Sequence, residues 1–123
     1  LTLEEFSSVS TLIGFSVGAS IIWRLSDNVA AHKVKRAICF YGSQIRNFTK
    51  ITPQFQMELV FPKKEPHFDV IKLQTELAKK QNVKTLRVNS LHGFMNYYSD
   101  NFDQTAYRDQ VNRLCSNEHT WKK

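Results

Sequence analysis

Cysteine is scarce in this sequence. Its 123 residues include two cysteines, Cys39 and Cys115, which lie far apart and in no metal-binding spacing. Such a pair gives neither a disulfide framework nor a cysteine-based zinc motif. Cys39 lies in an apolar run, where a free cysteine behaves as a small buried hydrophobe. We therefore expect a reducing, cytoplasmic compartment, and a site with no cofactor and no metal.

Long apolar runs and runs of like charge are also lacking. The most apolar stretch, residues 12–23, ends at Arg24 and is too short to span a bilayer. The net charge is +6, yet no five or six residues of like charge follow one another. Scattered lysines are typical of solvated helix and loop surfaces. We therefore expect neither a membrane nor a nucleic acid as partner.

The composition that remains is that of one soluble globular domain spanning residues 1–123, with 41% hydrophobic and 23% charged residues. Apolar runs and alternation predict strands at 9–14, 37–41, 56–61 and 83–88. Capping residues and apolar spacing predict a helical turn at 2–5 and helices from about 17 to 31, from 68 to 81 and after Asn101 or Asp103. Residues 43–54 and 91–101 are expected as loops. The alternation of strands and helices predicts an α/β domain with a mostly parallel sheet and helices on both faces.

The strongest motif is a G-x-S-x-G sequence at Gly14, Ser16 and Gly18. It lies between an apolar strand and an apolar helix, which is the context of a nucleophile elbow. The turn is sharp and strained, so we expect both glycines to be needed where neighbouring backbone comes close. The backbone N–H of Val17 then lies at a helix N-terminus, where it can stabilise an oxyanion. A glycine-rich turn with an incidental serine is the alternative.

A serine nucleophile needs a histidine and a carboxylate, and the chain offers both in the order Ser, acid, His. His92 follows the last predicted strand in a loop, as a general base should. Two carboxylates follow the strand at 56–61, and either Glu65 or Asp69 can orient the histidine. Asp69 also begins a helix and could instead cap it. His67, between the two acids, is expected to be a loop residue rather than the base.

These motifs together resemble the dienelactone hydrolase family of the α/β-hydrolase superfamily, from about Ser10 to Leu114. The residues that carry the resemblance are the elbow at 14–18, Phe40-Tyr41-Gly42, Glu65-Pro66-His67-Phe68, and His92-Gly93-Phe94 with Asn96. The lack of a helix between the second and third predicted strands is also similar to that family, as is the final helix with Phe102, Ala106 and Tyr107.

The resemblance implies a cytosolic hydrolase of esters or lactones that works without a metal. By position, Ser16 is the nucleophile, His92 the base and Glu65 the acid. The sequence departs from the family at three points. Dienelactone hydrolases proper use cysteine as nucleophile and aspartate as acid, and they bind the substrate carboxylate with an arginine shortly after the histidine. This chain has Met95 and Asn96 there.

The resemblance covers the C-terminal half of such a fold, so we expect the first strands and a second oxyanion donor to belong to residues before Leu1. A sheet of about four strands would expose a long apolar edge. The chain is therefore expected to be a fragment or to cover that edge by self-association as a homo-oligomer. The alternative to an esterase acting on a small-molecule ester or lactone is a non-catalytic, hydrolase-derived interaction module.

Overall fold

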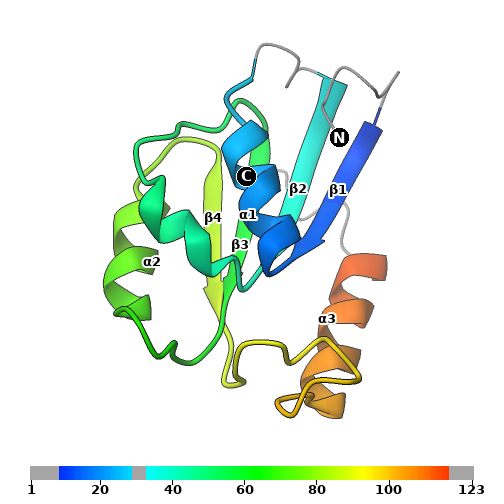
Figure 1. Ribbon diagram of the computed structural model, residues 1–123. Helices are drawn as coiled ribbons and strands as arrows, with labels where there is room; N and C mark the ends of the chain where they lie inside the picture. The colour runs from blue at the N-terminus through cyan, green and yellow to red at the C-terminus, as the bar shows by residue number, and fades with distance from the viewer. Residues whose placement is uncertain (1–8, 29–32, 117–123) are drawn as a thin grey trace.

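The computed structural model describes residues 9–28 and 33–116, with helix α1 preceding strand β2 and helix α3 ending the described chain (Figure 1). The helical turn expected at 2–5 and the residues expected to end the first helix lie outside this part. The elements, in chain order, are β1 (Val9–Phe15), α1 (Val17–Leu25), β2 (Val34–Phe40), the 3-10 helix η3 (Ser43–Asn47), β3 (Gln56–Phe61), α2 (Val70–Ala78), β4 (Val83–Arg87) and α3 (Gln104–Ser116).

The four strands form one all-parallel sheet in the order β1-β2-β3-β4. Across the sheet, Ile13 lies beside Ile38, which lies beside Glu58, which lies beside Lys84. This confirms the α/β class and the number of strands that the sequence predicted. The helices of this part of the chain are too short or too polar to cross a membrane.

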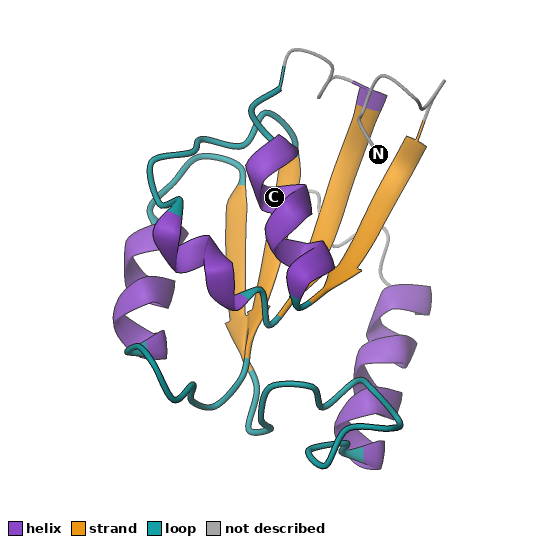
Figure 2. Ribbon diagram, viewed as in Figure 1, coloured by secondary structure: helices purple, strands orange, loops and turns teal. Residues whose placement is uncertain are grey.

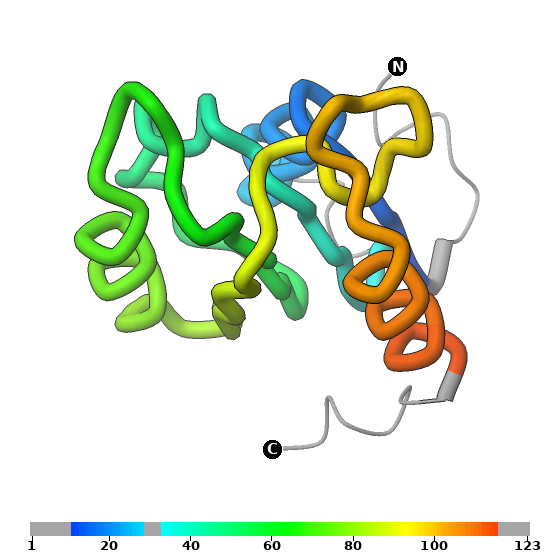
Figure 3. The backbone as a smooth tube through the Cα atoms, turned by 90° about the horizontal axis from the view of Figure 1, so that it is seen from below, coloured from blue at the N-terminus to red at the C-terminus, as the bar shows by residue number. Residues whose placement is uncertain are grey.

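The two faces of the sheet bury different residues because side chains alternate along each strand. Ala37, Cys39 and Met57 point to the face that α1 and α2 cover, and they belong to the larger core cluster. Ile38 and Phe40 belong to the opposite cluster, which α3 closes. The view along the strands shows α1 and α3 on opposite sides of the sheet, as the sequence predicted (Figure 3).

All four strands end at the same edge of the sheet, as they must in a parallel sheet. The segments after β3 (62–69) and after β4 (88–103) are long connections, drawn in teal, and they gather at that edge (Figure 2). The short turn between β1 and α1 opens there too. Functional side chains of open parallel sheets are typically found at such an edge.

Several element boundaries differ from those that the sequence predicted. Helix α1 ends at Leu25, because the N–H of Ser26 bonds to the carbonyl oxygen of Trp23 in a tighter turn and its hydroxyl donates to the same oxygen. The segment expected as a loop contains η3, whose Ile45 is buried in the core. Strand β2 stops before Tyr41, which adopts a positive φ of 41°.

The last helix begins as one of the two expected caps predicts. Asp103 Oδ1 accepts a hydrogen bond from the Ala106 N–H, and Oδ2 accepts one from the Ser90 hydroxyl. These bonds hold the pKa of Asp103 below its usual value. Ala106, Val111 and Leu114 of α3 pack against the sheet, while Tyr107 is exposed.

Candidate active site

Ser16 occupies a strained turn between β1 and α1. Its φ of 53° and ψ of −116° are rare for a residue with a side chain. The backbone is held there by a hydrogen bond from the Ser16 N–H to the Phe40 carbonyl oxygen, at 2.9 Å, and by the first helical bond, from Ser20 N–H to Ser16 O. A serine at this position usually caps its helix, but the Ser16 side chain makes no capping bond. Its hydroxyl is directed elsewhere.

The two glycines of the motif are not equally constrained. A Cβ built on Gly14 would lie 2.7 Å from Ile22 Cδ1 and 2.9 Å from the backbone N of Ala19. A Cβ on Gly18 would meet nothing within 4 Å. The expectation that both positions must be small was therefore right for Gly14 and wrong for Gly18, whose Cα faces open space.

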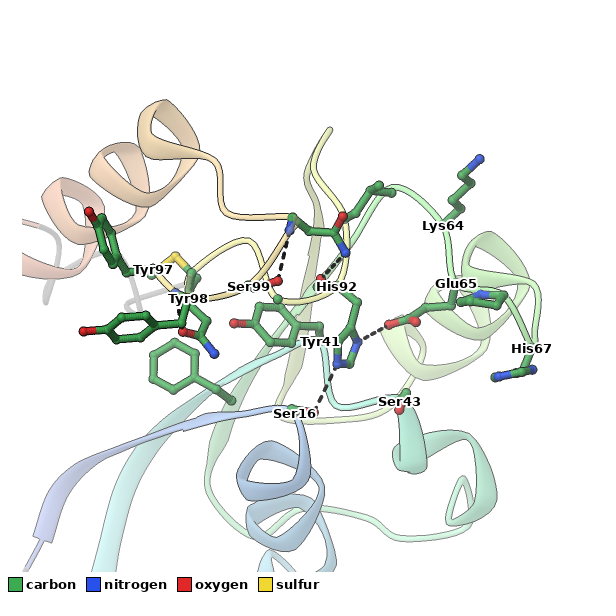
Figure 4. Close-up of a pocket in the computed structure, with 17 residues that line it drawn as sticks. Ser16, Tyr41, Ser43, Lys64, Glu65, His67, His92, Tyr97, Tyr98 and Ser99 are labelled. Atoms are coloured by element: carbon green, nitrogen blue, oxygen red, sulfur yellow. Dashed lines mark hydrogen bonds and ion pairs between the residues drawn. The ribbon is translucent and has the colours of Figure 1, made fainter.

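The structure brings Ser16, His92 and Glu65 into one hydrogen-bonded chain (Figure 4). Ser16 Oγ lies 3.1 Å from His92 Nε2, and His92 Nδ1 lies 2.7 Å from Glu65 Oε2. The Glu65 side chain is 6% exposed and that of His92 34%. Because an ionised carboxylate only accepts hydrogen bonds, Nδ1 carries the proton and Nε2 is free to accept from the serine.

Asp69, the other candidate acid, does not belong to this hydrogen-bonded chain. Asp69 is the N-cap of α2, where its Oδ1 accepts a hydrogen bond from the Lys72 N–H at 3.1 Å. His67 lies exposed in the same connection and lines the pocket, as a loop residue should. The Val17 N–H opens α1, and the first N–H groups of a helix have no partner within it.

Tyr41 is a site residue to which sequence reasoning gave no role. It follows the end of β2, and its ring centroid lies 4.8 Å from that of His92. It is buried, its N–H bonds to Val60 O, and burial raises its pKa, while a hydrogen bond with the Met95 backbone lowers it by less. The contact with His92 joins residues far apart in the chain, so no local sequence pattern predicted it, and the positive φ of Tyr41 that marks a constrained turn is a feature of the structure alone.

A pocket of 1290 Å³ opens at the hydroxyl of Ser16. Its two sides differ in chemistry (Figure 4). Tyr41, Tyr97 and Tyr98 lie on one side of His92, while Lys64 and His67 lie on the other, beyond Glu65. The serine lies between an aromatic side and a polar, basic side.

The residues that the structure describes contain no group of three or more histidine, cysteine, aspartate or glutamate side chains placed to hold a metal ion. Cys39 and Cys115 are both free thiols. Cys39 is buried, as its apolar run predicted, and burial raises the pKa of its thiol far above the usual value.

Comparison with known proteins gives one informative likeness. No family model matches the chain. Over 98 residues it is 38% identical to the uncharacterized protein YczH of Bacillus subtilis (strain 168), a match that covers 78% of this chain and 47% of that protein. The chain thus spans about half the length of the curated relative that it matches.

Proposed function

We propose that this protein is a serine hydrolase that cleaves a carboxylic ester or lactone, and that it is similar in mechanism to dienelactone hydrolases. The observation that supports this most is the hydrogen-bonded chain from Ser16 through His92 to Glu65, with its serine at a strained strand-to-helix turn. A serine, a histidine and a carboxylate in this geometry recur on unrelated folds that activate a serine for acyl transfer, and the chain order Ser, acid, His is that of α/β-hydrolases.

In the first half of the reaction, Ser16 Oγ attacks the carbonyl carbon of the ester. His92 Nε2 accepts the hydroxyl proton, and Glu65 stabilises the imidazolium that results. The tetrahedral intermediate carries its negative charge on the former carbonyl oxygen, where the Val17 N–H can donate a hydrogen bond. When the bond to the leaving oxygen breaks, His92 returns the proton to the alcohol and an acyl-serine remains.

In the second half, water attacks the acyl-serine carbonyl. His92 removes a proton from the water and gives it back to Ser16 Oγ as the carbon–serine bond breaks, so that the carboxylic acid is released and the enzyme is restored. Ring opening of a lactone follows the same steps, with the leaving alcohol still attached to the product.

Three features separate this site from dienelactone hydrolases proper. The nucleophile is a serine instead of a cysteine, and the acid is Glu65 instead of an aspartate. Met95 and Asn96 stand where those enzymes carry a carboxylate-binding arginine. A hydroxyl activated by a histidine can attack oxygen esters. Because no arginine stands at the position of Met95 and Asn96, a carboxylate on the substrate is not expected there. We therefore propose an esterase of broader type, in the reducing cytoplasmic compartment that two free thiols suit.

The test is covalent labelling of the intact protein with a fluorophosphonate, followed by intact mass and peptide mapping. We expect one adduct, on Ser16, because the probe reacts with serines that a histidine activates. The matched control is Ser43→Ala, since Ser43 lines the same pocket and is expected to leave labelling unchanged.

Ser16→Ala should remove both the adduct and the hydrolysis of short esters. If the wild-type protein takes up no probe and hydrolyses no ester, the enzyme proposal is wrong. The non-catalytic interaction module would then be the better account of the same fold.

A further inference from the structure

Three large aromatic side chains stand uncovered beside the nucleophile, and the proposed reaction does not use them. Phe15, Tyr97 and Tyr98 all line the pocket, and they are 43%, 74% and 90% exposed. We call these three residues the aromatic wall. An exposed apolar patch that borders a pocket typically marks a binding surface, because leaving it in water is unfavourable.

The loop that carries the two tyrosines is tied to the candidate base. Asn101 Nδ2 donates a hydrogen bond to the His92 carbonyl oxygen at 2.8 Å, so the loop closes back on the histidine. Within it, Asn101 N–H bonds to Ser99 Oγ and Tyr98 N–H bonds to Asn96 Oδ1. These bonds hold the tyrosines at a set position relative to His92.

Close packing keeps the loop in this shape. Gly93 has a φ of +90°, and a Cβ there would lie 2.6 Å from Ser99 Oγ. Behind the wall, the Tyr97 ring meets the Phe102 ring edge-on, with centroids 5.4 Å apart, and the centroids of Phe102 and Tyr107 are 5.8 Å apart. The ring centroids of Tyr98 and Tyr97 are 5.3 Å apart. The outer tyrosine is therefore supported by a row of rings that leads back to α3.

Phe15 completes the wall from the sheet. It directly precedes Ser16 and stacks on Phe40, with centroids 5.1 Å apart and planes 12° from parallel. Its ring is therefore fixed next to the nucleophile, with part of it open to the pocket. Lys64 and His67 lie on the opposite side of the pocket (Figure 4).

We propose that the aromatic wall binds an aromatic ring of the substrate, so that the protein prefers esters with an aryl-bearing acyl or alcohol group. This inference rests on the proposed esterase function. Aromatic rings gain offset-stacked and edge-to-face contacts with other rings beyond the burial of area, and a saturated ring of the same size does not. Three rings around one space favour the aromatic ligand over an alkyl one.

The experiment compares two matched pairs of esters on the intact protein. Methyl phenylacetate and methyl cyclohexylacetate share a leaving group, and benzyl acetate and cyclohexylmethyl acetate share an acyl group. We expect kcat/KM to favour the aromatic member by about 2- to 12-fold in at least one pair. The pair that responds tells which side of the ester carries the ring.

Substitutions at Tyr98 test whether the preference for aromatic esters depends on the aromatic wall. Tyr98→Leu keeps apolar area but removes the ring, so the aromatic-to-saturated ratio should fall towards one. Tyr98→Phe should keep the ratio. The control is Ile71→Ala, which truncates an exposed apolar side chain on α2 that does not line the pocket, and its ratio should match that of the wild type.

Fluorophosphonate labelling of Ser16 in the same samples separates the two proposals. A protein that labels and hydrolyses all four esters with ratios near one, or that keeps its preference in Tyr98→Leu, would overturn the aromatic subsite alone. Absence of both labelling and hydrolysis would overturn the esterase proposal and this inference with it.

Discussion

At the scale of single residues, the conformation of Ser16 lowers the stability of the fold in two ways. Its backbone conformation costs on the order of 1–3 kcal/mol, and its hydroxyl does not cap α1, a role worth about 1 kcal/mol. In exchange, Oγ faces His92 Nε2. Such a turn persists only where its surroundings hold it, and here the bond from Ser16 N–H to Phe40 O and the tight contacts of Gly14 do so.

The two glycines of the elbow should respond very differently to the same substitution. Gly14→Ala forces a methyl group against Ile22 and the backbone of Ala19, so it should destabilise the protein by about 1–3 kcal/mol. Gly18→Ala adds a methyl group in open space on a helix, so it should be neutral or stabilise by up to about 1 kcal/mol. Urea unfolding of both variants measures the difference.

The same pair tests whether the elbow geometry matters for reactivity. Gly14→Ala should also slow labelling of Ser16, because a displaced turn moves Oγ from the histidine, whereas Gly18→Ala should label at the wild-type rate. Equal unfolding free energies for the two variants would contradict the contacts that we describe at Gly14.

The two acids that the sequence left open give a second matched pair. Glu65→Gln keeps the shape of the side chain but cannot hold the Nδ1–H tautomer of His92, so kcat for ester hydrolysis should fall by about 10⁴. Asp69→Asn keeps a good capping side chain, so kcat and stability should both stay close to wild type. Steady-state kinetics on the two variants show which carboxylate orients His92. A larger loss of kcat in Asp69→Asn would assign that role to Asp69.

At the scale of elements, α3 is attached to the sheet by an ion pair as well as by apolar contacts. Arg113 Nη1 lies 2.8 and 2.9 Å from the two carboxylate oxygens of Glu58 in the middle of the sheet. The Glu58 side chain is 3% exposed and that of Arg113 26%. Gln110 accepts two further hydrogen bonds from the arginine. Since α3 follows the loop of the aromatic wall, this pair also supports the pocket.

Removing one partner of this ion pair should lower the free energy of unfolding more than replacing both partners. Arg113→Met leaves a buried carboxylate unpaired and should destabilise the protein by about 3 kcal/mol, the lower end of the range for buried pairs because the arginine is partly exposed. The double variant Glu58→Leu/Arg113→Met removes the buried charge and should recover much of that loss. A double-mutant cycle in urea measures the coupling; additive effects would show that the pair contributes little.

At the scale of the whole molecule, periodicity and motif order were enough to predict the sheet, its covering helices and the edge where the site lies. Residues 37–40 and 57–61, which are apolar apart from Glu58, are buried on both faces of the sheet, and this makes parallel strands easy to recognise. Boundaries such as the end of α1 depended on hydrogen bonds of Ser26 that no apolar pattern reports.

The residues of the candidate site could be predicted where strand order determines their place, and less well where tertiary packing determines it. The candidate nucleophile, acid and base follow the order of strands, so the sequence could predict that Ser16 and His92 lie at the same edge of the sheet, where the structure hydrogen-bonds them. Glu65 and Asp69 follow the same strand, and only the structure shows which carboxylate reaches the imidazole. The ring of Tyr41 against His92 and the tie from Asn101 to the His92 carbonyl are tertiary contacts without a local signal.

Strand β1 forms one outer edge of the sheet. Within residues 9–28 and 33–116, no strand pairs with the free edge of β1. Ile13 on β1 is exposed, and so are Val17 and Ile21 on α1, the helix that follows β1. An uncovered parallel edge with apolar side chains is a surface at which another chain can pair.

The chain of residues 1–123 should therefore self-associate when it is studied alone. Sedimentation velocity should show a mass that increases with concentration, and Ile13→Lys combined with Ile21→Lys should shift it towards the monomer, because charges on an edge oppose pairing. Ile71→Lys is the matched control: Ile71 is an equally exposed isoleucine, but it lies on α2, away from the edge, and its substitution should leave association unchanged. A chain that remains monomeric at all concentrations, or a control that dissociates it equally well, would show that the β1 edge is not the associating surface.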